Sequence, residues 1–229
     1  MEIIICLCIC ILTFLLLKYI FKINLKKAKE LEENVKMQEI TDRFPENIEI
    51  AKEMLKILGN KDVAIEEQKD TKTSLYIAVT NKILIADLKD NYGRIQTIAH
   101  ECLHSVQDRT LLMFNFIFSN ITILYFILSV ILTICHVLKN TLLQAFILLI
   151  LALIQFAVRG YLETDAMTKS KFLAKEYIEK KNLCTDEEVE KLMIEYDKIN
   201  NMGIPFYLCR IITNSLVKIS LYLIISAFC

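Results

Sequence analysis

The sequence predicts a mainly α-helical membrane protein, with three to four transmembrane helices and a small α+β domain on the cytoplasmic side. Hydrophobic residues make up 55% of the 229-residue chain, although its formal net charge is zero. Soluble domains of this size are usually less apolar. The charges are also segregated, because all but four charged residues lie in two blocks, 18–110 and 159–204. Polar blocks separated by long apolar stretches are typical of an integral membrane protein.

The composition also excludes several classes of protein. The chain has no excess of basic residues, so we expect no nucleic-acid partner. It is too apolar to be disordered. Its eight cysteines include no Cys-x-x-Cys pair, which argues against a zinc ribbon and against a thioredoxin-type redox site. The partner that the composition does predict is the lipid bilayer.

The first predicted element is a transmembrane anchor over residues 1–21. No charged residue lies between Ile3 and Leu17. A cleaved signal peptide would instead have basic residues before the apolar run and a small-residue cleavage site after it. Here Glu2 precedes the run and lysines follow it, so an uncleaved anchor is favoured.

The second half of the chain predicts two or three further spans. Residues 110–158 form two uncharged runs that meet at Lys139, with a short connection around His136–Asn140. This pattern predicts a transmembrane helical hairpin. The last stretch, 205–229, predicts a fourth span, although Lys218 lies inside it and a charge at mid-bilayer costs about 2.5–3.5 kcal/mol on insertion scales. The alternative is an amphipathic helix that lies on the membrane surface.

The distribution of basic residues predicts the orientation. Lysines crowd the exit of the first span, Arg109 precedes the hairpin and Arg159 follows it, whereas the hairpin tip carries only Lys139. Basic residues next to membrane spans favour the cytoplasmic side. We therefore expect a multi-pass protein of the cell membrane, with both polar blocks in the cytoplasm.

The first polar block, 22–109, predicts a mixture of helices and strands. Good helix formers continue from the first span to about Gln38, and a second helix begins at an Asn47 cap and ends at Gly59-Asn60. Two β-branched runs separated by three residues predict a strand hairpin. The expected strands of this block are 63–65, 75–79 and 83–86. Its last expected helix is 92–108.

The second polar block, 159–204, predicts two helices. The first covers 161–181. The second is capped by Thr185, with Glu188 three residues further on as in a capping box, and it ends near Asn200.

The sequence His100-Glu101-Cys102-Leu103-His104 is the most informative in the chain. Two histidines four residues apart project from the same face of a helix, so both imidazoles can reach one metal ion. Glu101 lies between them, where its carboxylate can take a proton from a water at the metal. This is the H-E-x-x-H arrangement of zinc peptidases. The alternative interpretation is a solvated helix with two incidental histidines.

A catalytic zinc site usually needs a third protein ligand. The remaining histidine, His136, is at the outer end of the hairpin, so the third ligand is expected to be a carboxylate. Glu163 and Asp165 are the candidates, because the hairpin returns them to the cytoplasmic surface where the H-E-x-x-H helix enters the membrane. A transmembrane hairpin places the two flanking helices side by side.

These motifs resemble the YugP-type membrane zinc metallopeptidases, which are distant relatives of the HtpX and CAAX-prenyl proteases. The resemblance covers most of the chain and rests on 51–55, Asp62-Val63, His100-Glu101-x-x-His104-x-x-Gln107 and Glu163-x-Asp165-Ala166. It implies a zincin-like (gluzincin) cytoplasmic domain that holds one Zn²⁺, with Glu163 as the third ligand. Gln107 and Asp165 are then expected to orient the ligands, and Asp165 is the alternative ligand.

The chain also departs from the family pattern. Small residues usually follow the motif glutamate, where this chain has Cys102 and Leu103, and HtpX-type proteins have an aspartate at the position of Met167. These departures concern the surroundings of the metal more than its ligands. Arg159 and Tyr161 are candidate donors to the oxyanion of the transition state.

The function expected from these residues is that of a membrane-anchored zinc endopeptidase, with Glu101 as the general base and a membrane-associated peptide or protein as the substrate. The alternative is a proteolytically inactive membrane adaptor or scaffold whose metal site is structural or vestigial.

Overall fold

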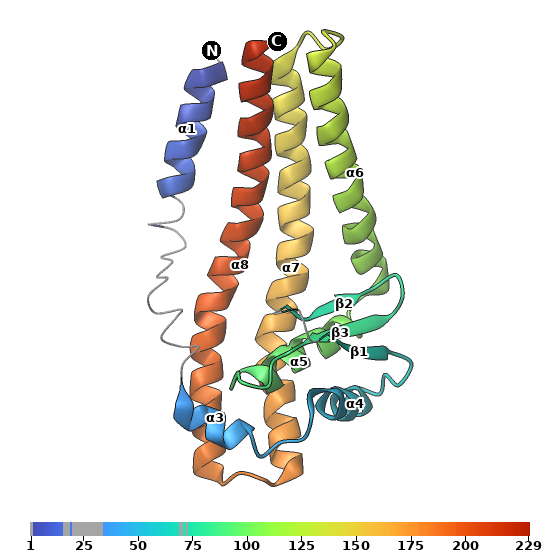
Figure 1. Cartoon of the computed structure of the whole chain (residues 1–229), viewed down its shortest axis with the longest axis vertical. Coiled ribbons are helices and arrows are strands. Elements are labelled where there is room, and N and C mark those ends of the chain that lie inside the picture. The colour runs from blue at the N-terminus through green and yellow to red at the C-terminus, as the bar shows by residue number, and fades with distance from the viewer. Residues whose placement is uncertain (1, 16–18, 20–33, 69–70, 72) are drawn as a thin grey trace. The chain divides into compact units, whose positions relative to one another are not determined.

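A computed structural model describes residues 2–15, 19, 34–68, 71 and 73–229. Most of the described chain is helical, with one small sheet (Figure 1). The end of the predicted anchor and most of the helix predicted up to Gln38 lie outside the described residues. The elements are α1 (Glu2–Leu15), α3 (Val35–Thr41), α4 (Asn47–Ile57), β1 (Ala64–Gln68), β2 (Leu75–Ile77), β3 (Lys82–Ala86), α5 (Arg94–His104), α6 (Arg109–Ile134), α7 (Thr141–Lys181) and α8 (Asp186–Phe228).

The chain divides into two compact units. The apolar unit consists of Met1–Ile23, Phe114–Tyr161 and Pro205–Cys229, and the polar unit consists of Asn24–Met113 and Leu162–Ile204. These units follow the segregation of charge in the sequence, because most of both charged blocks falls in the polar unit. Helices α7 and α8 each contribute residues to both units.

The apolar unit contains the candidate membrane spans. Among the described residues, α6, α7 and α8 are long and apolar enough to cross a membrane. This confirms three of the predicted spans at the level of length and composition, including the one at the C-terminal end. The first predicted span is described only as the 14-residue helix α1. Residues Ile5 and Ile9 of α1 pack against a buried cluster formed by Leu148, Ile219, Tyr222 and Leu223.

Inside the apolar unit, the helices are joined by hydrogen bonds and by one close approach. The hydroxyls of Thr133 on α6 and Tyr222 on α8 lie 3.1 Å apart, and both residues are buried. A Cβ added to Gly160 on α7 would lie 3.0 Å from Leu208 Cδ2 on α8. Glycine therefore lets these two helices approach closely, as small residues do in membrane helix pairs.

The C-terminal helix corrects one prediction. We expected a helix to end near Asn200 and a separate span to follow, but α8 continues without interruption from Asp186 to Phe228. Pro205 lies inside it. Proline removes a single backbone N–H, and neighbouring helices often let long apolar helices accommodate that loss.

The polar unit contains a three-stranded sheet in the order β1-β3-β2. β1 is parallel to β3, with Ala64 opposite Lys82, and β2 is antiparallel to β3, with Tyr76 opposite Ile83. The predicted strand hairpin is therefore confirmed, and Asn81 in its turn has a positive φ of 48°, which asparagine tolerates better than most residues. β1 begins one residue later than predicted and extends to Gln68.

One buried core joins the sheet to the helices of the polar unit. Helices α3, α4, α5, α7 and α8 contribute apolar side chains to it, in keeping with burial as the main stabilising contribution to folding. Fully buried members include Ile50 and Met54 of α4, Ile83 and Ile85 of β3, Ile95 and Ile98 of α5, Ile178 of α7, and Leu192 and Tyr196 of α8.

The C-terminal end of α4 is closed by local backbone hydrogen bonds. At its end, Gly59 has a φ of +72°, and the amides of Gly59 and Asn60 donate to the carbonyls of Lys56 and Leu55. This is a Schellman motif, as expected from the Gly-Asn pair. The predicted Asn47 cap is wrong, because Glu46 is the capping residue. Asn47 is the first helical residue instead.

Helix α5 is held at both ends by side-chain hydrogen bonds. At its start, the buried guanidinium of Arg94 donates to the carbonyls of Thr41, Phe44 and Pro45 and to Asn47 Oδ1, at 2.7–3.1 Å. At its end, the Asn60 amide donates to the carbonyl and the hydroxyl of Ser105. The helix is shorter than the predicted 92–108. These anchors fix the position of the residues considered next.

Candidate metal centre

Helix α5 places both motif histidines on one face, as the four-residue spacing predicts. Their rings meet edge to face, with centroids 4.5 Å apart. The two Nε2 atoms are 3.1 Å apart. The opposite face of α5 is anchored by Ile95, Ile98 and Cys102, which are fully buried in the core. Core packing therefore sets the direction in which the imidazoles point.

A carboxylate from α7 completes the group. Glu163 Oε2 lies 3.4 Å from His100 Nε2 and 3.7 Å from His104 Nε2. The three side chains are largely shielded from solvent, because the exposed fraction is 18% for both His100 and Glu163 and 10% for His104. One donor atom from each residue lies within 4.8 Å of the other two. Of the two carboxylates left open by the sequence, Glu163 is the one that faces the histidines.

The spacing of these three atoms fits a tetrahedral metal ion. With metal–nitrogen and metal–oxygen distances of about 2.0–2.2 Å, ligand atoms at tetrahedral angles lie about 3.4 Å apart. The observed separations of 3.1, 3.4 and 3.7 Å fall on both sides of that value. The donor set of two imidazoles and one carboxylate is also a common set for catalytic zinc. The residues present therefore fit Zn²⁺.

Gln107 fixes the tautomer of one histidine. His104 Nδ1 lies 2.8 Å from Gln107 Oε1. An amide oxygen accepts only, so neutral His104 carries its proton on Nδ1 and presents the lone pair of Nε2 toward Glu163 and His100. The Gln107 amide in turn donates to the carbonyl of Leu162 at 2.8 Å and to Asp165 Oδ2 at 3.1 Å. Gln107 thus connects the H-E-x-x-H helix to α7.

Asp165 belongs to this chain of hydrogen bonds and not to the group of three candidate metal ligands. One of its oxygens accepts from Gln107 and the other forms an ion pair with Lys169 Nζ at 2.6 Å. The arrangement is that of a residue that orients a ligand through a neighbour. The sequence prediction that Gln107 and Asp165 support the ligands is compatible with these contacts.

Glu101 is buried between the strands and the histidines, with 6% of its surface exposed. Burial raises the pKa of its carboxyl group, and Glu163 adds to this effect, while His100, His104 and a hydrogen bond from the Tyr76 backbone amide act in the opposite direction. Burial alone would lower the pKa of His104, but Glu163 more than offsets that effect and raises the pKa, because its carboxylate accepts a hydrogen bond from the protonated imidazolium and attracts its charge. The site thus couples two carboxylates and two imidazoles.

The edge of the sheet lies next to the general-base candidate. The Tyr76 amide that donates to Glu101 belongs to β2. β2 is the outer strand beyond β3 in the sheet. The sequence predicted the strand, but which backbone amide would face Glu101 depends on how the hairpin packs on α5.

Three other residues singled out in the sequence do not belong to the polar unit. Arg159 and Tyr161, the candidate oxyanion donors, belong to the apolar unit. Arg159 Nε donates to the Tyr207 hydroxyl at 2.9 Å, and Tyr161 is exposed. His136 is exposed in the turn after α6, as predicted, with a φ of 57°.

Comparison with known proteins assigns no family. No family model matches the chain, and neither a curated protein nor a solved structure matches it. The interpretation of the site therefore depends on its own residues.

Two contributors to the site were not predicted from the sequence. The Tyr76 amide acts through the backbone, so no side-chain signal identifies it. Lys169 forms its ion pair with Asp165 across one helical turn. Its i,i+4 spacing is a visible signal, because acidic and basic residues four apart on a helix commonly pair.

Proposed function

We propose that this protein is a membrane-anchored zinc-dependent endopeptidase. The observation that carries the proposal is the convergence of His100, His104 and Glu163 beside a buried Glu101. A purely structural site has no need of a carboxylate between its two histidine ligands. The resemblance to YugP-type metallopeptidases implies the same activity, with the same residues as ligands.

Each residue of the site has a distinct role in the proposed reaction. His100, His104 and Glu163 would hold the ion, and Gln107 keeps His104 in the tautomer that can bind it. Bound zinc supplies a Lewis acid that lowers the pKa of a water toward ~7 and polarises a peptide carbonyl. Glu101 takes a proton from the attacking water and passes it to the leaving amine.

The proposed substrate is an extended peptide segment. β2 is an outer strand, and its Tyr76 amide already contacts Glu101. A peptide that adds to the free edge of such a strand is bound through its backbone and is carried past the general base. This mode of binding suits an endopeptidase, because it does not require a free chain end.

The proposed location is the cytoplasmic face of the cell membrane. Glu163 follows the apolar run of α7 within the same helix, and α5 precedes α6 by only four residues. The basic residues that flank the hairpin support a cytoplasmic site. Membrane proteins and segments close to the membrane surface are therefore the substrates expected.

The experiment that tests the proposal compares the wild type with Glu101→Gln in lipid nanodiscs. Both proteins are loaded with zinc and incubated with solubilised membrane proteins, and new N-termini are identified by mass spectrometry. We expect cleavage by the wild type only, because glutamine cannot accept the proton from water. Zinc content should be the same in both, because Glu101 is not one of the ligands.

Glu190→Gln provides the matched control, because Glu190 is an exposed residue of α8 in the polar unit. It should cleave like the wild type. Equal cleavage by Glu101→Gln and the wild type would contradict the assignment of the base. A zinc-loaded wild type that cleaves nothing, and whose variants behave identically, would favour the adaptor alternative.

A further inference from the structure

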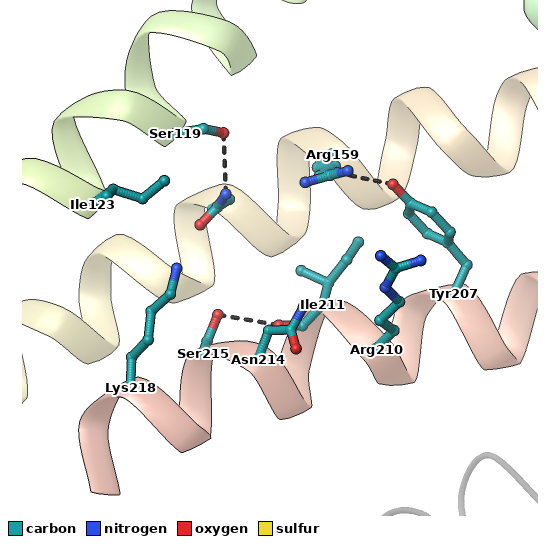
Figure 2. Close-up of a pocket in the computed structure, with 10 residues that line it drawn as sticks. Ser119, Ile123, Arg159, Tyr207, Arg210, Ile211, Asn214, Ser215 and Lys218 are labelled. Atoms are coloured by element: carbon teal, nitrogen blue, oxygen red, sulfur yellow. Dashed lines mark hydrogen bonds between the residues drawn. The ribbon is translucent and has the colours of Figure 1, made fainter. Parts of the chain in front are cut away.

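A second group of polar residues lies within the apolar unit, separate from the candidate metal centre. A cavity of about 160 Å³ is lined by residues of α6, α7 and α8 (Figure 2). Three of its lining residues are cations, Arg159, Arg210 and Lys218. No carboxylate is found among the described residues that line it. The cavity therefore concentrates positive charge in the part of the chain that is otherwise most apolar.

The cations project from regular positions on two helices. Tyr207, Arg210, Asn214 and Lys218 recur at spacings of three and four on α8, so they share one face. Figure 2 shows the side chains of Arg210 and Lys218 extending from α8 toward α7, which carries Arg159. The polar face is therefore a continuous feature and not a single misplaced charge.

The neighbours of these cations supply hydrogen bonds but no negative charge. Arg159 Nε donates to the Tyr207 hydroxyl at 2.9 Å, and its guanidinium lies 5.7 Å from the centre of that ring. Gln155 Nε2 donates to Ser119 Oγ at 3.0 Å, which joins α7 to α6 at the cavity wall. Within the described chain, neither Arg210 nor Lys218 forms an ion pair. Burying a cation within a membrane span costs free energy unless the cation is paired. A bound anion would therefore stabilise the cations of this cavity.

The position of the cavity along the helices indicates where the anion comes from. Arg159 directly follows the uncharged run of α7, and Arg210 lies five residues after Pro205, the first residue of the C-terminal apolar segment. Lys218 lies two turns further along α8, about 12 Å by the rise of a helix, and a lysine side chain can extend toward the interface. If α7 and α8 cross the membrane over these apolar runs, the end of the cavity near Arg159 and Arg210 is at the depth of lipid headgroups. Arg210 and Asn214 are exposed.

We propose that this cavity binds the phosphate of an anionic lipid headgroup. Guanidinium groups match phosphate oxygens in pairs, and lysine adds a point charge. Basic pockets between transmembrane helices on the cytoplasmic side are typical sites for such headgroups. Pockets that enclose larger ligands have volumes of about 300–1,000 Å³. The cavity is smaller than this, so it suits one small anionic group and not a peptide segment. The bound phosphate would neutralise the cations that the helices bring together.

The test uses the full chain in nanodiscs of two compositions. One contains phosphatidylcholine alone, and the other contains equal parts of phosphatidylcholine and phosphatidylglycerol. Native mass spectrometry after release from the mixed nanodisc counts the phosphatidylglycerol retained on the protein. We expect the wild type to retain it selectively and to unfold at a higher temperature in the mixed nanodisc, because a ligand that binds only the folded state raises its apparent stability.

The variants Lys218→Met and Arg210→Gln remove the charge and keep the approximate shape. Both should lose the retained lipid and the thermal shift, yet remain folded in pure phosphatidylcholine, where no anion is present to be lost. Lys218→Arg should keep both, which separates charge from side-chain length. Lys139→Gln, at the hairpin tip outside the cavity, is the matched control and should behave like the wild type.

Retention of the same lipid by both charge-removing variants would overturn the proposal.

Two further additions identify the source of the anion. If inorganic phosphate alone reproduces the thermal shift in detergent, the cavity is a free-anion site and the lipid assignment is wrong. If a short peptide with a free C-terminal carboxylate displaces the lipid, the cavity belongs to a peptide and the assignment is likewise wrong. Because none of these measurements involves cleavage, the result is independent of the proposed endopeptidase activity.

Discussion

The candidate metal centre depends on individual atoms that approach one another within 4 Å. His100, Glu101 and His104 could be predicted from the sequence because a single helix fixes their spacing. The choice between Glu163 and Asp165 could not, because residues two apart on a helix point about 200° apart and the rotation of α7 decides which one faces α5. In the structure Glu163 is the carboxylate that faces the histidines, with its Oε2 3.4 Å from His100 Nε2. Asp165 instead joins Lys169 and Gln107.

Gln107 should influence metal affinity without touching the metal. Its Oε1 accepts the Nδ1 proton of His104, and loss of such a partner typically weakens metal binding about 10–100-fold. We therefore expect Gln107→Leu to bind zinc more weakly by about that factor, measured by competition with a chromophoric chelator. Gln38→Leu, in α3, is the control and should bind like the wild type. Unchanged affinity in Gln107→Leu would show that the hydrogen bond does not support the ligand.

The ion pair at the start of α8 predicts a pH dependence of stability. In the polar unit, two hydrogen bonds from Arg43 and one from the Thr185 amide lower the pKa of Glu188 to about 2, from an ordinary value of 4.5. A lowered carboxyl pKa stabilises the fold at pH values above 4.5, and this stabilisation is lost as the pH falls toward 2. The thermal midpoint of the wild type should therefore exceed that of Glu188→Gln at pH 6.

The difference between the two midpoints should shrink progressively between pH 4.5 and pH 2. Differential scanning calorimetry of the two proteins at matched pH values measures it directly. Groups common to both proteins cancel in the comparison. A difference that does not change over this range would contradict the role of the Glu188 charge.

At the scale of elements, the position of α5 depends on its two anchored ends. The Arg94 guanidinium satisfies three backbone carbonyls and Asn47 Oδ1 in the turn that leads to α4. Lysine has no planar fork and cannot reach all four acceptors. Acceptors left buried without a donor cost about 1–3 kcal/mol each.

We therefore expect Arg94→Lys to lower the free energy of unfolding of the polar unit by about 2–4 kcal/mol. Urea denaturation followed by circular dichroism measures the change. Lys36→Arg, on the first turn of α3, provides a surface control of the same residue types. A decrease in the free energy of unfolding below about 0.5 kcal/mol, the size of an ordinary surface substitution, would show that the four hydrogen bonds of Arg94 are not needed.

Most elements could be predicted from local signals, and the exceptions have physical reasons. The Gly59-Asn60 end of α4 and the Thr185–Glu188 capping box behave as their residue types predict. The predicted Asn47 cap was wrong because the Asn47 side chain is used by Arg94, a partner 47 residues away. The predicted end near Asn200 was wrong because the helix continues through Pro205. Long-range contacts of this kind leave no local pattern.

At the scale of the whole molecule, the distribution of charge along the chain corresponds to the division into two units. The sequence predicted the hairpin and its short turn, and α6 and α7 are indeed joined by the six residues between Ile134 and Thr141. The cluster of cations in the apolar unit could not be predicted. It depends on which faces of α7 and α8 meet, whereas each charge alone is only a costly residue in an apolar run.

The orientation of the hairpin gives a prediction at this scale. A reporter inserted after Asn140 should be active outside the cell, whereas the same reporter inserted after Asn182, in the turn between α7 and α8, should be active inside. Basic residues at both ends of the hairpin favour this arrangement. If both insertions report the same side, α7 does not cross the membrane. If the two sides are reversed, the proposed cytoplasmic site is wrong.

The central claim is that two histidines of α5 and one glutamate of α7 hold a single zinc ion. The most direct measurement is the zinc content of purified protein, by inductively coupled plasma mass spectrometry, for the wild type, Glu163→Gln and Asp165→Asn. We predict about one zinc per wild-type chain, as expected for a site built from one set of three ligands. Glu163→Gln should lose most of it, and Asp165→Asn should keep it. Full zinc content in Glu163→Gln, or its loss only in Asp165→Asn, would contradict the account.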